Sequence, residues 1–319
     1  MEMRTLGSLG PVSALTIGGG GLGQVWGATS RDEAVATLRE ALDGGITLID
    51  LAPLYGNGEA ETVLGEAFAG SLPPGVRVTT KCMLGSPPAR DVYDRLSASL
   101  DASLGRMRLS AVDIFILHGM IDANAAEGAT RRTSLSLFRS AVVPAFQRLV
   151  EEGRIRAWGI TAIGVPSALI SVFEDEPPPH AAQCIANLLD SPGGIGRSAD
   201  EPRPRDIIAA AQRQGVGVLA IRAVQAGALT DRIDRDLPED HPEMVDYRRA
   251  EPFRRLAHEL GTTAAFLAHR YALSLPGVDS VVLGVKNREE LRECLAAEAA
   301  GPLAPEAIAA IDNAVTESR

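Results

Sequence analysis

Four polar side chains that could share a proton-transfer reaction follow short apolar segments in the first half of the chain. Asp50 ends the segment TLID, Lys81 ends VRVTTK and His118 ends DIFILH, while Tyr55 follows shortly after Asp50. A tyrosine phenol, with an ordinary pKa of about 10, is a weak proton donor near neutrality. A lysine ammonium beside it would lower that pKa, and an aspartate would hold the lysine charged. This set predicts a proton donor facing an oxygen that gains negative charge, with the histidine assisting.

Each of these residues alone has a more common explanation. Tyr55 could be a loop aromatic, and Lys81 a charge that reaches solvent from a strand end. Asp50 could cap a turn, and His118 could be a buried, hydrogen-bonded histidine. Their order favours a shared site, because the ends of neighbouring strands lie roughly 4.8 Å apart. Buried polar groups are also stable only when they satisfy one another.

Eight apolar segments alternate with amphipathic stretches, which predicts a parallel sheet. The segments are continuously apolar, as in strands covered on both faces. The predicted strands are Ala14–Gly18, Thr47–Asp50, Val76–Lys81, Asp113–His118, Arg156–Thr161, Ala181–Ala186, Gly217–Ile221 and Ser280–Leu283. The predicted helices are Arg31–Asp43, Glu59–Phe68, Asp91–Leu104, Ser140–Glu151, Asp206–Gln214, Thr262–Leu273 and Arg288–Ala297. Eight such units in 319 residues favour one α/β domain over residues 1–319, a (β/α)8 or TIM barrel.

The glycine-rich run GGGGLG at residues 18–23 offers a rival fold, a doubly wound dinucleotide-binding sheet. That fold needs a helix directly after the glycines, whereas QVWG follows here and the next helix is predicted only near Ser30. The run is therefore predicted to be a turn from strand to loop. Longer connections at 119–140, 187–204 and 222–262 are predicted to build the catalytic face of the barrel.

Composition excludes several classes of function. A formal net charge of −10 argues against nucleic acid as the main partner. Three widely spaced cysteines form neither a disulfide framework nor a zinc motif, which suits the cytoplasm, and no leader or membrane-spanning run is visible. A metal-dependent barrel hydrolase would need clustered ligands, but of the five histidines only His118 ends a strand, so no metal is predicted.

Several segments resemble the aldo-keto reductase family. They are LTIGGGGLGQVWG, GITLIDLAPLYGNGEAETVLGEAF, VTTKC and DIFILH, followed by the looser blocks RIRAWGIT, QCIANLLD, GVLAIRAVQAGALT and VVLGVKNREELRE. The resemblance implies a barrel plugged by an N-terminal β-hairpin near residues 3–13. It also implies an NAD(P)H-dependent oxidoreductase of small aldehydes or ketones, or of the corresponding alcohols. Its catalytic tetrad would be Asp50, Tyr55, Lys81 and His118, with Tyr55 as the general acid.

The same resemblance assigns residues around the nicotinamide. Gln183 would hydrogen-bond its amide, and Thr161 would keep a hydroxyl contact, although Ala162 replaces the usual asparagine. Ile221 would cover the ring where tyrosine is common. Arg222 could reach the pyrophosphate or simply cap a loop. Trp26 is predicted to line the substrate pocket, or else to pack beneath the loop that carries it.

The last block bears on the choice between NADP and NAD. Asn287 and Glu290 predict a capping box that opens the final helix, and a helix N-terminus attracts phosphate. Glu290 stands where relatives that bind NADP often carry arginine, which favours NAD, whereas Lys286 and Arg288 could bind the 2′-phosphate. Glu293 matches an adenine contact. The balance favours NADP slightly, with NAD possible.

Two alternatives on the same fold remain open. One is an NAD-dependent sugar or alcohol dehydrogenase that works mainly in the oxidative direction. The other is a cofactor-binding redox sensor with little turnover, similar to the β subunits of potassium channels, to which the changes at Ala162 and Ile221 point.

Overall fold

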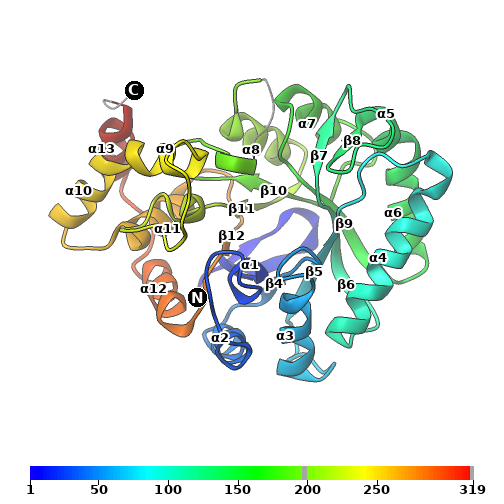
Figure 1. Ribbon diagram of the computed structural model, residues 1–319, viewed down its shortest axis with the longest axis horizontal. Helices are drawn as coiled ribbons and strands as arrows, with labels where there is room; N and C mark the ends of the chain where they lie inside the picture. The colour runs from blue at the N-terminus through cyan, green and yellow to red at the C-terminus, as the bar shows by residue number, and fades with distance from the viewer. Residues whose placement is uncertain (196–199, 317–319) are drawn as a thin grey trace.

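The computed structural model describes residues 1–195 and 200–316, and its centre is a closed barrel of eight parallel strands (Figure 1). These strands neighbour one another in chain order, and the last closes on the first through the pair Val282 and Thr16. They are β3 (Leu15–Gly18), β4 (Leu48–Asp50), β5 (Arg77–Cys82), β6 (Val112–Leu117), β9 (Ile155–Thr161), β10 (Ala181–Ile185), β11 (Gly217–Ile221) and β12 (Ser280–Leu283). All eight predicted strands are confirmed.

Helices surround the barrel, and all seven predicted helices are present. They are α2 (Arg31–Asp43), α3 (Glu59–Phe68), α4 (Val92–Met107), α6 (Val143–Glu151), α8 (Pro204–Arg213), α11 (Ala264–Ser274) and α12 (Arg288–Ala299). Side-chain caps fix several starting points, because a cap satisfies a backbone N–H that the helix leaves unpaired. The Ser30 hydroxyl accepts from the Glu33 amide at 3.1 Å and so begins α2.

The prediction of a turn for the glycine run is wrong, because residues Gly19–Leu22 form the one-turn helix α1. Glycine is a poor helix former, but close packing decides the conformation here. A Cβ added at Gly21 would lie only 1.9 Å from the Val285 carbonyl oxygen. Side-chain patterning cannot reveal such a contact.

The long connections contain more regular structure than predicted. The strands β7 (Met120–Asp122) and β8 (Arg132–Ser134) and the short helix α5 (Leu135–Leu137) lie within 119–140. The helices α9 (Pro242–Arg249) and α10 (Glu251–Glu259) lie within 222–262, and α7 (Pro166–Phe173) and α13 (Pro305–Thr316) were also missed. Proline stands in the first turn of α7, α9 and α10, where its missing N–H costs no hydrogen bond.

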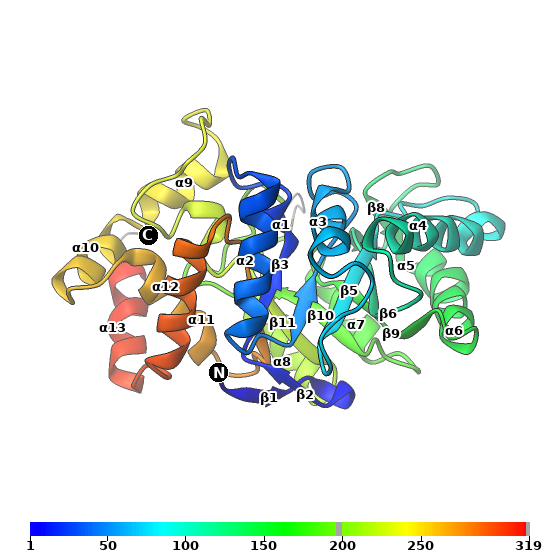
Figure 2. The same ribbon diagram turned by 90° about the horizontal axis from the view of Figure 1, so that it is seen from below.

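An N-terminal hairpin closes one end of the barrel, as predicted. Its strands β1 (Met3–Thr5) and β2 (Pro11–Ser13) pair antiparallel, and Figure 2 shows them at the end opposite α9. Leu6 and Val12 from the hairpin are fully buried in a small core with barrel residues such as Leu48 and Leu219. The hairpin therefore plugs the base and leaves the carboxyl ends of the strands as the open face. No helix among the described residues is long and apolar enough to cross a membrane.

Candidate active site

A buried lysine lies at the centre of a polar cluster where β4 and β5 end. The Nζ of Lys81 donates to Asp50 Oδ2 at 2.8 Å, to the Leu51 carbonyl oxygen at 2.8 Å and to the Tyr55 hydroxyl at 3.1 Å. Lys81 is 0% exposed and Asp50 is 2% exposed. The structure thus brings together three of the four side chains that the sequence placed at or just after strand ends, with Lys81 in contact with both Asp50 and Tyr55.

Strand register explains this convergence. Asp50 pairs with Thr79 across β4 and β5, and alternation along β5 turns Thr79 and Lys81 to the same side. The Thr79 hydroxyl donates to Asp50 Oδ1 at 2.5 Å, and the Gln183 amide donates to the same oxygen from β10 at 2.7 Å. The Asp50 carboxylate is therefore held by three side-chain donors. Thr79 was not predicted as a site residue, although its spacing of two from Lys81 in the sequence could have identified it.

Tyr55 lies in the connection between β4 and α3, in a backbone that glycine makes possible. Gly56 has a φ of +65°, and a Cβ there would lie 2.5 Å from the Gly23 carbonyl oxygen. The ammonium of Lys81 is 4.7 Å from the centroid of the Tyr55 ring. The tyrosine is thus fixed from its backbone as well as from its hydroxyl.

His118 follows β6 directly and completes the group. Its ring meets the Tyr55 ring edge to face, with centroids 5.9 Å apart. Its Nδ1 is buried and has no hydrogen-bond partner among the described residues. Burial, with a smaller contribution from the Lys81 charge, lowers the pKa of His118 to about 3. The imidazole is therefore neutral near pH 7, and a neutral imidazole can donate a hydrogen bond from one ring nitrogen and accept one at the other.

The pKa of the phenol differs from the expectation. Burial raises the pKa of Tyr55 above its ordinary value, and the lowering by Lys81 only partly offsets this. The lowering by the ammonium agrees with the expectation, whereas the desolvation of the phenolate, which outweighs it, was not predicted. Burial also opposes the charge of Lys81, but Asp50 and Tyr55 outweigh it and raise the pKa of the lysine. Near neutrality the cluster thus holds a neutral phenol beside a charged ammonium.

The half-buried, neutral His118 should make the protein less stable as the pH falls. The pKa of His118 is about 3 in the folded chain and 6.5 in the unfolded chain. Between these two pH values the unfolded chain binds a proton at His118 and the folded chain does not, which stabilises the unfolded chain. We expect the free energy of unfolding to fall by about 2 kcal/mol more between pH 7 and pH 5 in the parent than in His118→Leu. Urea unfolding at both pH values measures this, and equal losses in the two proteins would contradict it.

The residues predicted to hold the nicotinamide lie at the ends of three neighbouring strands. Thr161 on β9 pairs with Gln183 on β10, and Ile221 on β11 pairs with Ile185 on β10. The Thr161 hydroxyl is buried and has no hydrogen-bond partner among the described residues. An unpaired hydroxyl beside a carboxamide on the next strand suits an amide ligand, which offers both a donor and an acceptor.

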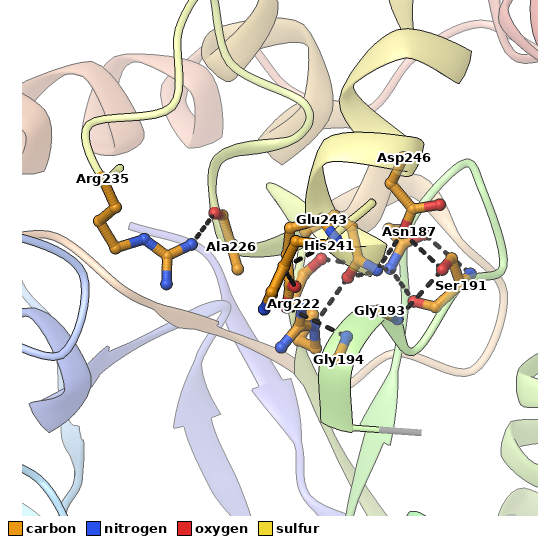
Figure 3. Close-up of polar contacts among 11 residues, drawn as sticks. Asn187, Ser191, Gly193, Gly194, Arg222, Ala226, Arg235, His241, Glu243 and Asp246 are labelled. Carbon is orange, nitrogen blue, oxygen red and sulfur yellow. Dashed lines mark hydrogen bonds and ion pairs between the residues drawn. The ribbon is translucent and has the colours of Figure 1, made fainter. Parts of the chain in front are cut away.

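Arg222 lies in a buried polar cluster that joins the segments after β10 and β11 (Figure 3). Its guanidinium donates to Gln225 Oε1 at 2.7 Å and to Glu243 Oε1, on α9, at 2.8 Å. Glu243 also accepts from the Gly194 amide at 3.1 Å. The cluster continues through Asp246, which accepts bonds from Gln225 and from Ser191. These contacts join the loops after β10 and β11, which fits the alternative in which Arg222 caps a loop. A contact of Arg222 with a pyrophosphate stays a prediction.

The predicted capping box at the start of α12 is modified. The Asn287 Oδ1 accepts from the Glu290 amide at 2.9 Å, but the Glu290 carboxylate accepts from the amide of Lys286, at 2.8 Å, instead of that of Asn287. The Lys286 ammonium lies between two carboxylates, with Asp234 at 2.6 Å and Glu290 at 2.9 Å. Glu293, one turn further along α12, accepts a bond from the Thr263 hydroxyl.

Trp26 covers the ends of β3 and β12. A Cβ added at Gly20 would lie 2.5 Å from the Trp26 Nε1, and one at Gly284 would lie 3.1 Å from it. The guanidinium of Arg235 lies 5.2 Å from the indole ring centroid and also donates to the Ala226 carbonyl oxygen, as Figure 3 shows for the latter pair. The tryptophan therefore contacts the connection at 222–262 through Arg235. Its place in a substrate pocket stays a prediction.

Comparisons with known proteins agree with this architecture. The model of the aldo/keto reductase family matches residues 14–316. L-galactose dehydrogenase from Arabidopsis thaliana is 31% identical over 93% of this chain and 88% of its own length. A potassium channel β subunit described as putative, from Schizosaccharomyces pombe, is 27% identical over 86% of this chain and 82% of its own.

A solved structure shows the same fold. An aldo-keto reductase from Bacillus halodurans, in its holo form, superposes with a TM-score of 0.75 over 98% of this chain and 96% of its own, at 22% identity. The family match over nearly the whole length, together with the closed barrel and its hairpin plug, settles the relationship. This chain belongs to the aldo/keto reductase family.

Proposed function

We propose that the chain is an NAD(P)H-dependent oxidoreductase that reduces an aldehyde or ketone, or oxidises the corresponding alcohol, with Tyr55 as the general acid. The observation that carries the proposal is the contact of the Tyr55 hydroxyl with the buried ammonium of Lys81 at 3.1 Å. A phenol in that position can release a proton because the ammonium stabilises the phenolate that remains.

The residues around the phenol supply the rest of the proton transfer. Asp50 holds the Lys81 ammonium at 2.8 Å and so fixes its direction. Neutral His118 has a free ring nitrogen that can hydrogen-bond the substrate oxygen and hold it near the Tyr55 hydroxyl. In the reductive direction Tyr55 donates its proton to that oxygen, and in the oxidative direction the phenolate removes it.

The chain also has residues that fit a nicotinamide. The unpaired hydroxyl of Thr161 and the carboxamide of Gln183 would hold its amide group, and Ile221 would cover one face of the ring. The cofactor, when bound, supplies or accepts the hydride. The role of the chain is then to orient the ring, hold the substrate oxygen and move one proton at Tyr55.

The test is turnover with a panel of carbonyl compounds, followed by the absorbance of the reduced nicotinamide. Fluorescence titration with NADPH and NADH should first show binding of at least one of them. Turnover of any aldehyde or ketone, or of the matching alcohol with oxidised cofactor, supports the proposal. Tight cofactor binding without turnover across the panel would instead favour a redox sensor, as the similarity to a channel β subunit suggests.

One observation favours the oxidative alternative, an NAD-dependent sugar or alcohol dehydrogenase. Asp234 and Glu290 both contact the Lys286 ammonium, and Glu33 pairs with Arg288 at 3.0 Å. The cations that could bind a 2′-phosphate are thus already neutralised, which favours NAD over the NADP slightly preferred from the sequence. The relative at 31% identity is named a sugar dehydrogenase, L-galactose dehydrogenase, which supports the oxidative direction but does not bear on the cofactor.

Removal of one of these carboxylates should move the cofactor preference toward NADP. For Glu290→Gln we expect the ratio of kcat/KM with NADP to kcat/KM with NAD to rise about fivefold, since two charges about 4 Å apart in water interact by roughly 1 kcal/mol. Glu152→Gln is the matched control, because Glu152 forms an i,i+4 ion pair with Arg148 at the end of α6, away from α12. An equal change in both variants, or none in Glu290→Gln, would contradict a 2′-phosphate position beside Lys286.

A further inference from the structure

Another buried carboxylate lies on the helix-facing side of β5, the strand that carries Lys81. Glu61, in the first turn of α3, is 0% exposed. Its Oε1 accepts a hydrogen bond from the Thr80 hydroxyl at 2.5 Å, and its Oε2 accepts one from Arg106 Nε at 2.7 Å. Glu61 is not among the site residues predicted from the sequence, and it takes no part in the proton transfer proposed for Tyr55.

Thr80 connects this carboxylate to the residue next to Lys81. Side chains alternate along a strand, so Thr79 and Lys81 point toward Asp50 while Thr80 points to the helix layer. The end of β5 is therefore anchored on both faces, by Asp50 on the inside and by Glu61 on the outside. A strand held only from the inside could slide or twist and carry the ammonium with it.

Arg106 connects the same carboxylate to the loop that carries Tyr55. A Cβ added at Gly58 would lie 2.7 Å from the Arg106 Cδ and 2.9 Å from its Nε, so the arginine packs directly on this loop. On the other side a Cβ at Gly23 would lie 2.6 Å from the Tyr55 carbonyl carbon. The segment from Tyr55 to Gly58 is thus confined between α1 and the arginine that Glu61 holds.

We infer that Glu61 is a positioning residue for the proton donor, tying the strand of Lys81 to the loop of Tyr55 and so maintaining the contact between ammonium and phenol. The inference rests on the proposed function of those two residues. An ion pair that merely joined α3 to α4 would need only Arg106. The bond to Thr80 adds the strand, and it is this bond that distinguishes positioning from simple helix packing.

Two nearly isosteric variants test the inference. Thr80→Val removes the hydroxyl, and Glu61→Gln removes the charge. Thr16→Val is the matched control, because the Thr16 hydroxyl also makes one buried side-chain bond, to Ser280 Oγ at 2.7 Å, between β3 and β12. Since a misplacement of about 1 Å can cost about 100-fold in rate, we expect kcat per folded enzyme to fall about 10- to 100-fold in both test variants. Thr16→Val should retain the parental kcat.

Three further readouts separate positioning from stability. Cofactor Kd should stay within about twofold of the parent in every variant, since the lost interaction acts on the chemical step. The alkaline limb of the pH–rate profile should move to higher pH in Thr80→Val, because a displaced Lys81 no longer lowers the pKa of Tyr55. Amide hydrogen exchange in residues 52–60 should be faster in both test variants but not in Thr16→Val, whether or not a substrate has been found.

The inference would be overturned if kcat, the pH–rate profile and the exchange rates of both test variants equalled those of the parent. It would also be overturned if activity fell only in proportion to the fraction of folded protein. The Tyr55→Phe variant, measured alongside, separates this failure from failure of the proposed function. If Tyr55→Phe retains turnover, the role of Tyr55 is wrong. If Tyr55→Phe is inactive while Thr80→Val and Glu61→Gln are fully active, only the positioning role is wrong.

Discussion

Replacing Tyr55 with phenylalanine is expected to lower kcat by roughly 10²- to 10⁴-fold, the usual contribution of one general acid. The change removes a single oxygen atom and leaves the ring, so the edge-to-face contact with His118 is retained. The Lys81 ammonium loses one of three acceptors but keeps Asp50 and the Leu51 carbonyl oxygen. Stability should therefore change far less than activity.

Cofactor binding separates the loss of chemistry from the loss of the site. Fluorescence titration should give a Kd for Tyr55→Phe within about twofold of the parent, because the phenol oxygen acts on the transition state rather than on the bound ground state. Tyr93→Phe is a useful control, since the Tyr93 hydroxyl bonds to Glu152 on the outer helices. Turnover of Tyr55→Phe at the parental rate would refute the assignment of Tyr55 as the proton donor.

The parts of this molecule that could be predicted from the sequence are those with a local signal. The barrel strands are continuous apolar runs, and Asp50, Lys81 and His118 are conspicuous because a charged or titratable residue ends each run. Thr79 carries only the weak signal of its spacing of two from Lys81, and Glu61 carries none. Their importance depends on partners brought by other segments, since Glu61 meets Thr80 and Arg106 only once the helices have packed.

Three other features escaped prediction for a related reason. In the helix α1, Gly21 lies against the Val285 backbone, a close contact between opposite ends of the chain that the sequence does not display. The pair of Arg222 and Glu243 depends on how the connection at 222–262 folds. The helix α9 in that connection is too polar and too short to show an apolar stripe in the sequence. The burial of the phenol, which raises the pKa of Tyr55, likewise depends on packing that the sequence does not display.

Replacing Lys81 with methionine is expected to reduce both activity and stability, and the two losses have different causes. The carboxylate of Asp50 would stay buried without its counter-charge, and breaking a buried ion pair from one side costs about 3–5 kcal/mol. Thr79 and Gln183 still donate to Asp50 in this variant, so the loss of stability should lie at the lower end of this range. Urea unfolding of Lys81→Met measures it.

The double variant Asp50→Asn with Lys81→Met isolates the catalytic part. It removes both charges, so much of the stability should return, whereas kcat should stay at least about 100-fold below the parent because no ammonium stabilises the phenolate. Alcohol oxidation gives the sharper measurement, since the phenolate is the base and the rate rises with pH. Without Lys81 the pKa of Tyr55 must lie higher still, and the rising limb should move to higher pH. A pH–rate profile identical to that of the parent would mean that the ammonium, although it lies 3.1 Å from the phenol, does not tune it.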